Sequence, residues 1–582
     1  MLKDATMTEG RNDRGRPARR GARMAATLAA ALIGATGCGD MGERWSRLFK
    51  RSKSEDSTPV PARASSNAVQ DTVQGLATVE GLRVTVVRGY GLVVGLVGTG
   101  GSDAPDDVRK YLQQEILRRR TGISSKELLD SRDTAIVVVT GEVPAAAMSG
   151  QRFDVVVRAM GNQTTSLDGG MLLECDLKLL AATPRGVIEG KTFAVAAGPI
   201  FITPFRRGED KGDDLRVGRV LGGGMLRESR RLRIVLDSPT YNIAARIRDR
   251  LNSRYGAAAP VADAVSPDVI QLTVPSAMRG NEKHFLDLVL HTTINGAPAF
   301  VERRAAELAE EIQHPQAPYD AISLAWEAMG RSVLPAIRPI YSHRTVAARF
   351  YAARAGMRLG DSQAVGIIVQ HALASGDPFR LVAIEELANP TAGAAAADAL
   401  QTLAGDPDNR VRIAAYKVML QRRHPAISPE AVGGQFVLDV VECGGPPLVF
   451  VATSEQQRLA LLGRKHTLRP PASYRDDDVT IAIDEGDSEF RIVRVNPRSK
   501  QASPLIRCGL DLREFIRLLG ERPGETPDGR PTGLGLTYSG VVRVLNELHG
   551  QGALTGAFLV DRPSVSDELW KIRTPSRPES EF

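Results

Sequence analysis

Cysteine and aromatic residues are scarce in this sequence. Four cysteines and 5% aromatic residues are spread over 582 residues. Cys175, Cys443 and Cys508 stand far apart in the chain, which argues against a disulfide framework. No cysteine or histidine pair has the spacing of a zinc site. We therefore expect burial of apolar side chains to hold the fold together, without covalent or metal cross-links.

Sequence motifs of catalysis and cofactor binding are also missing. There is no G-x-S-x-G elbow and no H-E-x-x-H helix, and the eight histidines are scattered. The run from Gly95 to Ser102 comes near a phosphate-binding loop, but Gly101 stands where the lysine belongs. Leu92 to Val97 are strand formers, which favours two short buried strands joined by glycine turns. We predict no nucleotide, no cofactor and no metal, and a protein that is not an enzyme.

Paired carboxylates are the one alternative that favours an enzyme. Asp213 with Asp214, or Asp237 with Glu228, would supply the acid and base of a glycosidase. Acidic residues beside glycine turns are more often surface features. A further acidic cluster either binds a cation or forms solvated hairpin ends, and it lacks the spacing of a calcium loop. Its members are Asp476, Asp477, Asp478, Asp484, Glu485 and Asp487.

The N-terminus has the organisation of an export signal. The net charge is +7, and part of the excess comes from six arginines between Arg11 and Arg23. A short apolar run, Met24 to Ala35, follows, and it is too short to span a membrane. The sequence predicts a signal peptide over residues 1–37 and a flexible linker over 38–75. Since part of the basic charge lies in a segment that would be removed, we expect no nucleic-acid partner.

Cys38 ends the run A-T-G-C, which resembles a bacterial lipoprotein cleavage site. Two interpretations stand: Cys38 is the lipid attachment site, or the segment is a plain cleavable signal peptide with an incidental cysteine. The first interpretation predicts a periplasmic, membrane-anchored lipoprotein of the outer membrane–periplasmic space.

Residues 76–298 mix strand-like runs with glycine turns and two amphipathic helices, which predicts an α+β domain. The expected helices are Pro105 to Arg119, with Val108, Leu112, Ile116 and Leu117 on one face, and Asn242 to Tyr255. The expected strands are Leu82 to Val87, Gly91 to Leu96, Thr134 to Glu142, Arg152 to Ala159, Met171 to Leu180, Lys191 to Ile202, Arg231 to Val235 and Val269 to Val274.

Several motifs in this region occur in an order that resembles a known family. They are Val79 to Leu82, Gly89 to Gly100, Gln151 with Phe153, Asp154 and Val155, the run S-L-D-G-G-M-L-L from Ser166 to Leu173, Ala197 to Pro199, Gly218 with Gly223, and positions from Thr240 to Pro275. In this order the segment resembles the flagellar P-ring family, whose periplasmic subunits form the bushing around the rod in the peptidoglycan layer.

The resemblance implies a non-catalytic structural component of the bacterial flagellar basal body that supports motility. Expected partners are further copies of the chain in a ring, the flagellar rod and other ring proteins, close to peptidoglycan, with a membrane reached through the lipid. The expected structural motif consists of Gly89, Tyr90, Gly91, Gly95, Gly98, Gly100, Phe153, Asp154, Gly169 and Gly170. Gly91, Gly95 and Gly98 are expected to allow close backbone approach or positive φ.

Residues 299–428 change to one helical pattern after another. Gly376-Asp377-Pro378 and Gly405-Asp406-Pro407 are near-copies, each predicted to open a helix with its aspartate as the cap. The pattern resembles HEAT-type repeats, with a plain helical bundle as the alternative. Arg344, Arg349, Arg410 and Arg412 either line a partner groove or brace adjacent repeats.

Residues 429–563 read as a mixed α/β domain of unknown role, and 564–582 as a disordered tail. The expected fold class is thus α+β multidomain: a β-rich P-ring-like N-terminal domain, an α-helical HEAT-like region and a mixed α/β C-terminal domain. The alternative function is a periplasmic lipoprotein scaffold that binds protein partners through the helical repeats outside the flagellum.

Overall fold

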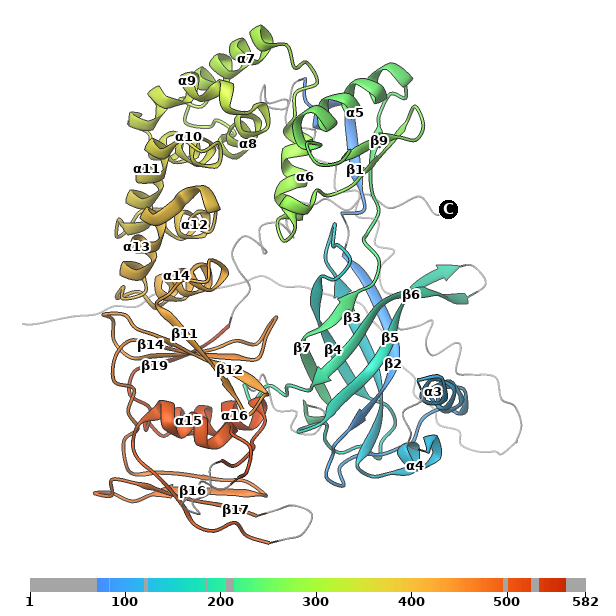
Figure 1. Ribbon diagram of the computed structural model, residues 1–582, viewed down its shortest axis with the longest axis vertical. Helices are drawn as coiled ribbons and strands as arrows, with labels where there is room; N and C mark the ends of the chain where they lie inside the picture. The colour runs from blue at the N-terminus through green and yellow to red at the C-terminus, as the bar shows by residue number, and fades with distance from the viewer. Residues whose placement is uncertain are drawn as a thin grey trace, which may run out of the picture. The chain divides into compact units, whose positions relative to one another are not determined.

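A computed structural model describes residues 71–82, 84–119, 124–183, 186–205, 214–495, 501–524 and 533–561 (Figure 1). A β-rich region is followed by a helical region and then by a region of mixed strands and helices. The predicted α+β multidomain class is confirmed. Cys38, Asp213, the predicted signal and tail, and residues 38–70 of the predicted linker lie outside the described residues, whereas the last residues of that linker, from Val73 on, belong to the helix α2 (Val73–Leu76).

The first region is built around a closed antiparallel barrel with the strand order β2-β3-β4-β7-β6-β5. Its strands are β2 (Thr85–Val94), β3 (Thr134–Val143), β4 (Arg152–Ala159), β5 (Met171–Thr183), β6 (Gly186–Pro199) and β7 (Val217–Leu226). In β4, the buried Phe153, Val155 and Val157 alternate with more exposed residues. This period of two, carried mainly by β-branched residues, places one set of side chains in the barrel core.

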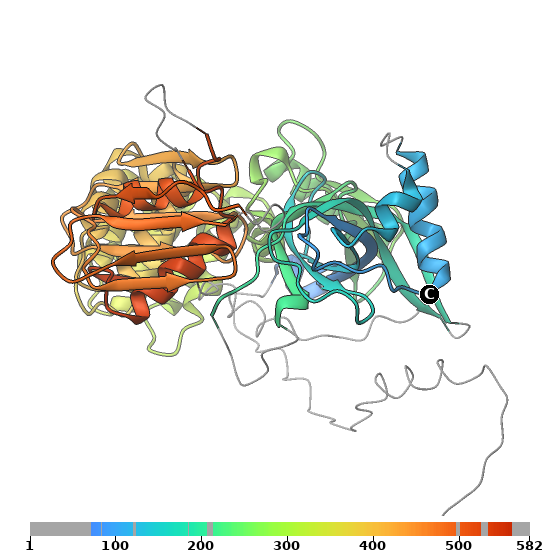
Figure 2. The same cartoon turned by 90° about the horizontal axis from the view of Figure 1, so that it is seen from below.

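Two helices lie on the outside of the barrel, α3 (Asp106–Arg118) and α4 (Ser125–Asp130) (Figures 1 and 2). Val108, Leu112 and Ile116 of α3 are buried together with barrel residues such as Leu92, at the spacing of one helix face. Leu117, predicted to share that face, is 68% exposed. That prediction is wrong, because Leu117 follows Ile116 by one residue and so lies about 100° further around the helix.

A second, smaller layer combines a four-stranded antiparallel sheet of order β1-β8-β10-β9 with helices. Its elements are α2 (Val73–Leu76), β1 (Ala77–Glu80), β8 (Leu232–Leu236), α5 (Tyr241–Tyr255), β9 (Ala262–Ala264), β10 (Val269–Leu272) and α6 (Glu282–His291). Ile247 and Leu251 of α5 and Phe285 of α6 pack in the same core as Ile234 of β8. The Thr240 side chain accepts a hydrogen bond from Ile243 N and so caps α5.

The helical region follows directly. Its helices are α7 (Pro298–Glu311), α8 (Tyr319–Met329), α9 (Leu334–Ile337), α10 (Val346–Arg358), α11 (Ser362–Leu373), α12 (Arg380–Glu386), α13 (Gly393–Leu403) and α14 (Asn409–Gln421). Each contacts helices close in sequence: α10 lies against α8 and α11, and α14 lies against α12 and α13. Stacking of neighbours buries one continuous core. The HEAT-like repeat itself stays a prediction.

The two predicted caps in this region are corrected by the structure. The carboxylates of Asp377 and Asp406 accept hydrogen bonds from Phe379 N and Asp408 N, both at 2.8 Å, and so close a turn before each helix. The residue that caps α14 is Asp408, whose Oδ1 accepts from Arg410 N at 2.8 Å. The prediction missed this extra turn, so it placed the cap two residues too early.

The C-terminal region has two sheets with two helices between them (Figure 1). One sheet has the order β11-β12-β14-β13-β19 and the other β15-β16-β17-β18. The elements are β11 (Ile427–Val432), β12 (Phe436–Val441), β13 (Leu448–Val451), β14 (Arg458–Leu462), β15 (Ala472–Arg475), β16 (Val479–Ile483), β17 (Phe490–Arg494), β18 (Ile506–Cys508), α15 (Leu512–Gly520), α16 (Tyr538–Gly550) and β19 (Ala557–Val560). One face of the first sheet joins the core of the helical region, and the other joins the core around α15 and α16.

Candidate functional site

The glycine segment predicted as a structural motif forms β2 and the turn after it. Gly89, Tyr90 and Gly91 lie within β2, and a Cβ at Gly91 would stand 2.9 Å from the Leu172 side chain. Gly95 and Gly98 have φ values of +82° and +73°. These are the backbone properties expected of the segment.

The turn after β2 is bonded to the chain around Asp133. Leu96 N donates to Asp133 O at 3.0 Å, Gly98 N to Asp133 Oδ1 at 3.0 Å, and Gly100 N to Arg132 O at 2.8 Å. A phosphate-binding loop needs its N–H groups free to point at the anion. These three N–H groups already have protein acceptors, one of them a carboxylate, so the segment holds the barrel wall together.

Tyr90 lies in a hollow of about 170 Å³ between α3 and the barrel. Its ring is 6.2 Å from that of Tyr111, in an edge-on arrangement. Arg119 spans the hollow and bonds Glu174 at 2.9 Å and Asp176 at 3.0 Å. Burial raises the pKa of the neighbouring Cys175 thiol to about 12, so this cysteine is not a nucleophile near neutral pH. The hollow lies where α3 packs against the barrel, and the charged side chains that line it form ion pairs with one another.

Phe153 and Asp154 are adjacent on β4 and point in different directions. Phe153 is buried in the barrel, and a Cβ added at Gly141 or Gly224 would stand within 2.6 Å of its ring. Asp154 accepts at Oδ1 from Gly222 N at 2.7 Å and from Glu455 N at 3.0 Å. Asp154 therefore joins the barrel to the C-terminal region, although the two donors are far apart in sequence.

Gly169 and Gly170 form the turn before β5, next to Asp168. Gly170 N donates to Leu167 O at 3.1 Å, and Gly170 O accepts from Ile200 N at 2.9 Å. The Asp168 carboxylate pairs with Arg543 of α16. Arg543 also bonds Asp476 at 2.9 Å, and its pKa is raised because these two carboxylates outweigh the cost of burial.

The contact between the barrel and the C-terminal region also involves Phe201, Ser539 and Arg543. None of these three residues is among the predicted motif residues. Phe201 follows β6, is 1% exposed, and packs in the core of the C-terminal region with its ring 5.4 Å from that of Tyr538. Ser539 Oγ accepts from Ile202 N at 3.0 Å and donates to Ile200 O at 3.4 Å. The apolar run after Pro199 was a signal for burial, but no signal in the sequence pointed to Ser539 or Arg543.

Among the carboxylates considered for catalysis, Glu228 pairs with the exposed Lys191. In the acidic cluster, Asp478 pairs with Arg494 at 3.1 Å, and Asp484 pairs with Arg491. The pKa of Asp476 is lowered because hydrogen bonds from Tyr474 and Arg543 outweigh its burial. Among the described residues, no group of three or more acidic, histidine or cysteine side chains is arranged to hold a metal ion.

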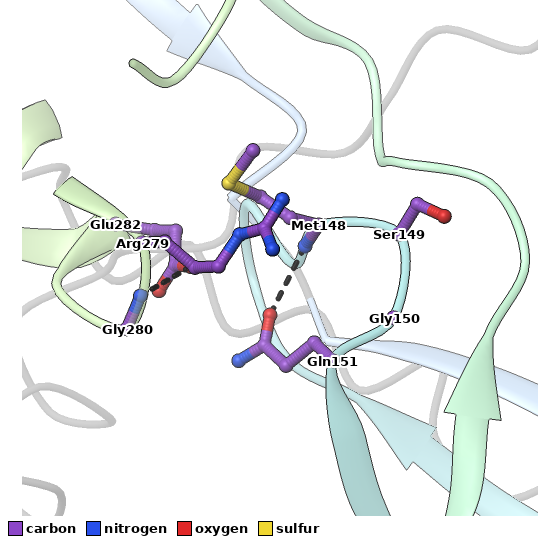
Figure 3. Close-up of a pocket in the computed structure, with 7 residues that line it drawn as sticks. All are labelled: Met148, Ser149, Gly150, Gln151, Arg279, Gly280 and Glu282. Carbon is purple, nitrogen blue, oxygen red and sulfur yellow. Dashed lines mark hydrogen bonds between the residues drawn. The ribbon is translucent and has the colours of Figure 1, made fainter. Parts of the chain in front are cut away.

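A second hollow, of about 120 Å³, lies between the turn before β4 and the residues that lead into α6 (Figure 3). Gln151 Oε1 accepts from Met148 N at 3.0 Å on one side, and Glu282 Oε1 accepts from Gly280 N at 2.8 Å on the other. Each polar side chain thus closes its own turn. The hollow is smaller than the ~300–1,000 Å³ of typical ligand pockets.

A buried charge cluster joins α6 to the helical region. Glu327 of α8 bonds His284 of α6 at 2.7 Å and Arg358 of α10 at 3.1 Å, and Arg358 bonds Glu386 of α12 at 2.6 Å. Burial favours the neutral form of Glu327, but Arg358 and His284 outweigh it and lower its pKa to about 2. Four helices are thereby connected through the side chains of this cluster.

Of the arginines considered for a partner groove, some are exposed to solvent and others bond to neighbouring parts of the chain. Arg412 is fully buried and donates to Ala404 O at 2.9 Å and to Leu462 O at 3.1 Å, which links α14 to β14. Arg349 donates to His343 O at 3.2 Å. Arg410 is exposed beside Asp408. Arg412 therefore braces α14 against β14, the bond of Arg349 stays at the start of its own helix α10, and Arg344 is exposed.

In the described parts of the chain, no helix has the length and apolar character needed to cross a bilayer.

Comparison with known proteins identifies the region that carries the barrel. Residues 72–300 match the model of the family described as flagellar P-ring protein. The flagellar P-ring protein of Anaeromyxobacter dehalogenans is 34% identical over 226 residues, which cover 37% of this chain and 57% of that relative. Flagellar P-ring protein 1 of Bradyrhizobium diazoefficiens is 30% identical over 257 residues, 42% of this chain and 66% of the relative. The flagellar P-ring protein of Aquifex aeolicus is 32% identical over 215 residues, 35% of this chain and 56% of the relative. The chain thus spans less than two thirds of the length of these relatives.

Proposed function

Because residues 72–300 carry a flagellar P-ring family domain, we propose that this chain is a structural, non-catalytic component of the bacterial flagellar basal body. The observation that carries the proposal is the match of one continuous region, which includes the whole barrel and the smaller sheet layer, to relatives named flagellar P-ring protein. The domain would contribute to a ring of identical subunits around the rod in the periplasm, near peptidoglycan and other ring proteins.

The interior of this domain supports a structural role. Its core is made mainly of aliphatic side chains, the N–H groups described in its glycine turn are bonded to protein oxygens, and the charged groups beside its larger hollow are paired. Such an arrangement favours a rigid subunit whose interactions occur at its surface. The ten predicted motif residues would act by fixing the barrel wall and its turns.

Cys38 would attach the chain to the membrane through a lipid. The support is the A-T-G-C run after a basic and apolar leader. With a lipid on Cys38, the residues between Cys38 and α2 would act as the tether that lets the family domain reach the ring.

Deletion of the gene tests the proposed function. We expect the deletion strain to lose motility in soft agar and to yield basal bodies that lack a periplasmic ring in electron micrographs, and the wild-type gene to restore both. Complementation with Cys38→Ala tests the lipid anchor separately from ring formation. We expect the variant protein to be lost from the membrane fraction. Normal motility with complete basal bodies in the deletion strain would refute the proposal and favour a scaffold outside the flagellum.

A further inference from the structure

The C-terminal region returns to the barrel, although it follows the family domain by more than a hundred residues. The amide of Ile202 bonds Ser539 across 337 positions of sequence, and the amide of Glu455 bonds Asp154 across 301 positions. The segment from Pro199 to Phe205, here called the barrel strap, provides the apolar part of this contact. It follows β6 and packs against the C-terminal region.

Side chains of the C-terminal region form a buried binding surface for the barrel strap. Phe201 is 1% exposed among the side chains around α16, and Phe205 lies 6.2 Å from Phe558 between ring centres. Ser539, itself 1% exposed, uses its one hydroxyl group for the strap backbone on both sides of Phe201. A buried hydroxyl that is left without a partner is costly, so this serine is matched to the strap.

Backbone geometry on the barrel side is matched to the same contact. Gly222 has a φ of +59°, and a Cβ at this position would lie 2.2 Å from Glu455 O. The Gly222 amide and the Glu455 amide both donate to Asp154 Oδ1. A glycine is therefore needed here for two reasons, the positive φ and the close approach of the C-terminal region.

The surface covered in this way belongs to the motifs that resemble the P-ring family. Asp154 follows Phe153, Asp168 lies in S-L-D-G-G, Pro199 ends A-G-P, and Gly222 lies in G-R-V-L-G-G-G. Asp154 accepts a hydrogen bond from the Glu455 amide, and Pro199 O accepts one from the Gln457 side chain. Asp168 forms an ion pair with Arg543. All three partners lie outside residues 72–300, the matched region.

We propose that the C-terminal region is an intramolecular cap on the P-ring family domain. In the free chain it covers the motif-bearing surface of the barrel around β4, β7 and the barrel strap, and release of the cap exposes this surface to a second copy of the same chain. The proposal rests on the proposed function, since a ring requires contacts between copies. The contact has a polar part that can open, because the Asp168–Arg543 pair is partly exposed and is weakened by salt.

A wedge at Gly222 tests the cap in the full mature chain. Gly222→Ala places a methyl group against Glu455 O, whereas Gly150→Ala has the same kind of φ, +83°, with nothing within 4 Å of its Cβ. Both variants share the strain of alanine at positive φ, so only the first disturbs the cap. The measurements are hydrogen exchange of peptides covering 199–205 and 452–458, and sedimentation velocity at several concentrations.

We expect Gly222→Ala to raise exchange in both peptides by about tenfold or more and to form oligomers at concentrations where the wild type and Gly150→Ala are monomeric. Asp168→Lys should act in the same way, because it places a cation opposite Arg543 and leaves the Arg543–Asp476 pair intact, and the addition of Arg543→Glu should restore part of the protection and of the monomer. Faster exchange without self-association, or an oligomeric wild type with both peptides protected, would overturn the cap. These results come from purified protein, so they fail or succeed independently of motility in the deletion strain.

Discussion

Gly95 directly follows β2, with a φ of +82°. An L-residue in this conformation costs about 1–2 kcal/mol, and a β-branched residue costs more. We expect Gly95→Ala to lower the free energy of unfolding by about 1–2 kcal/mol, and Gly95→Val to lower it further and to impair folding or assembly. Thermal melting of the full chain, followed by circular dichroism, measures both.

Gly366 supplies the control for this substitution. It lies in α11, its φ is not positive, and a Cβ there meets nothing within 4 Å. Alanine in a helix is favoured over glycine by about 0.5–1 kcal/mol, so Gly366→Ala should melt at or above the wild-type temperature. A Gly95→Ala protein as stable as Gly366→Ala would show that the turn after β2 does not depend on glycine.

Residue-level prediction from sequence succeeded where the backbone alone decides the outcome. Gly95 and Gly98 have the positive φ that their place between strand-forming residues suggested. The partners of Asp154 and Asp168 were not predictable, because Glu455 and Arg543 reach them from positions about 300 or more residues away. A single sequence carries no signal of such pairs.

The charge cluster of α6, α8, α10 and α12 sets the expected behaviour of these elements in acid. Glu327 has a folded pKa of about 2, below the ~4.3 of an unfolded glutamate. Its ionised form therefore stabilises the fold above about pH 4 to 5, and this contribution disappears as the pH falls towards 2. Glu327→Gln leaves Arg358 and His284 without this carboxylate, so we expect a loss of about 3 kcal/mol at pH 7 that shrinks at pH 3.

Urea unfolding at pH 7, 5, 4 and 3 checks this difference between Glu327→Gln and the wild type. Glu302 is an exposed glutamate on α7, and Glu302→Gln serves as the control with an expected change of under 0.5 kcal/mol at each pH. A Glu327→Gln deficit that stays constant from pH 7 to pH 3 would contradict the assignment.

Elements with a clear period were predictable, and elements without one were not. The strand predicted at Arg152 to Ala159, which has a clear period of two, is found with the same bounds as β4. The helix α6 was missed, because its apolar residues Phe285, Leu286, Leu288 and Val289 form a nearly continuous run that does not distinguish a helix from a buried strand. The extra turn before α14 likewise has no periodic pattern.

At the scale of the whole molecule, the order of the three regions followed from composition and pattern, whereas their mutual contacts did not. The sequence does not show which surface of the C-terminal region contacts the barrel strap. The apolar residues of such a contact cannot be distinguished from residues buried in the core of their own region. The same limit applies to contacts between copies of the chain, which is why the proposed ring has to be examined in the basal body.

The position of the protein in the basal body tests the central claim most directly. A deletion strain is complemented with the full chain carrying a C-terminal epitope tag, its motility is confirmed, and its purified basal bodies are labelled with gold-conjugated antibody and imaged by electron microscopy. We predict gold at a ring around the rod in the periplasmic part of the structure. Basal bodies with a complete ring and no gold, from cells whose envelope contains the tagged chain, would contradict the account.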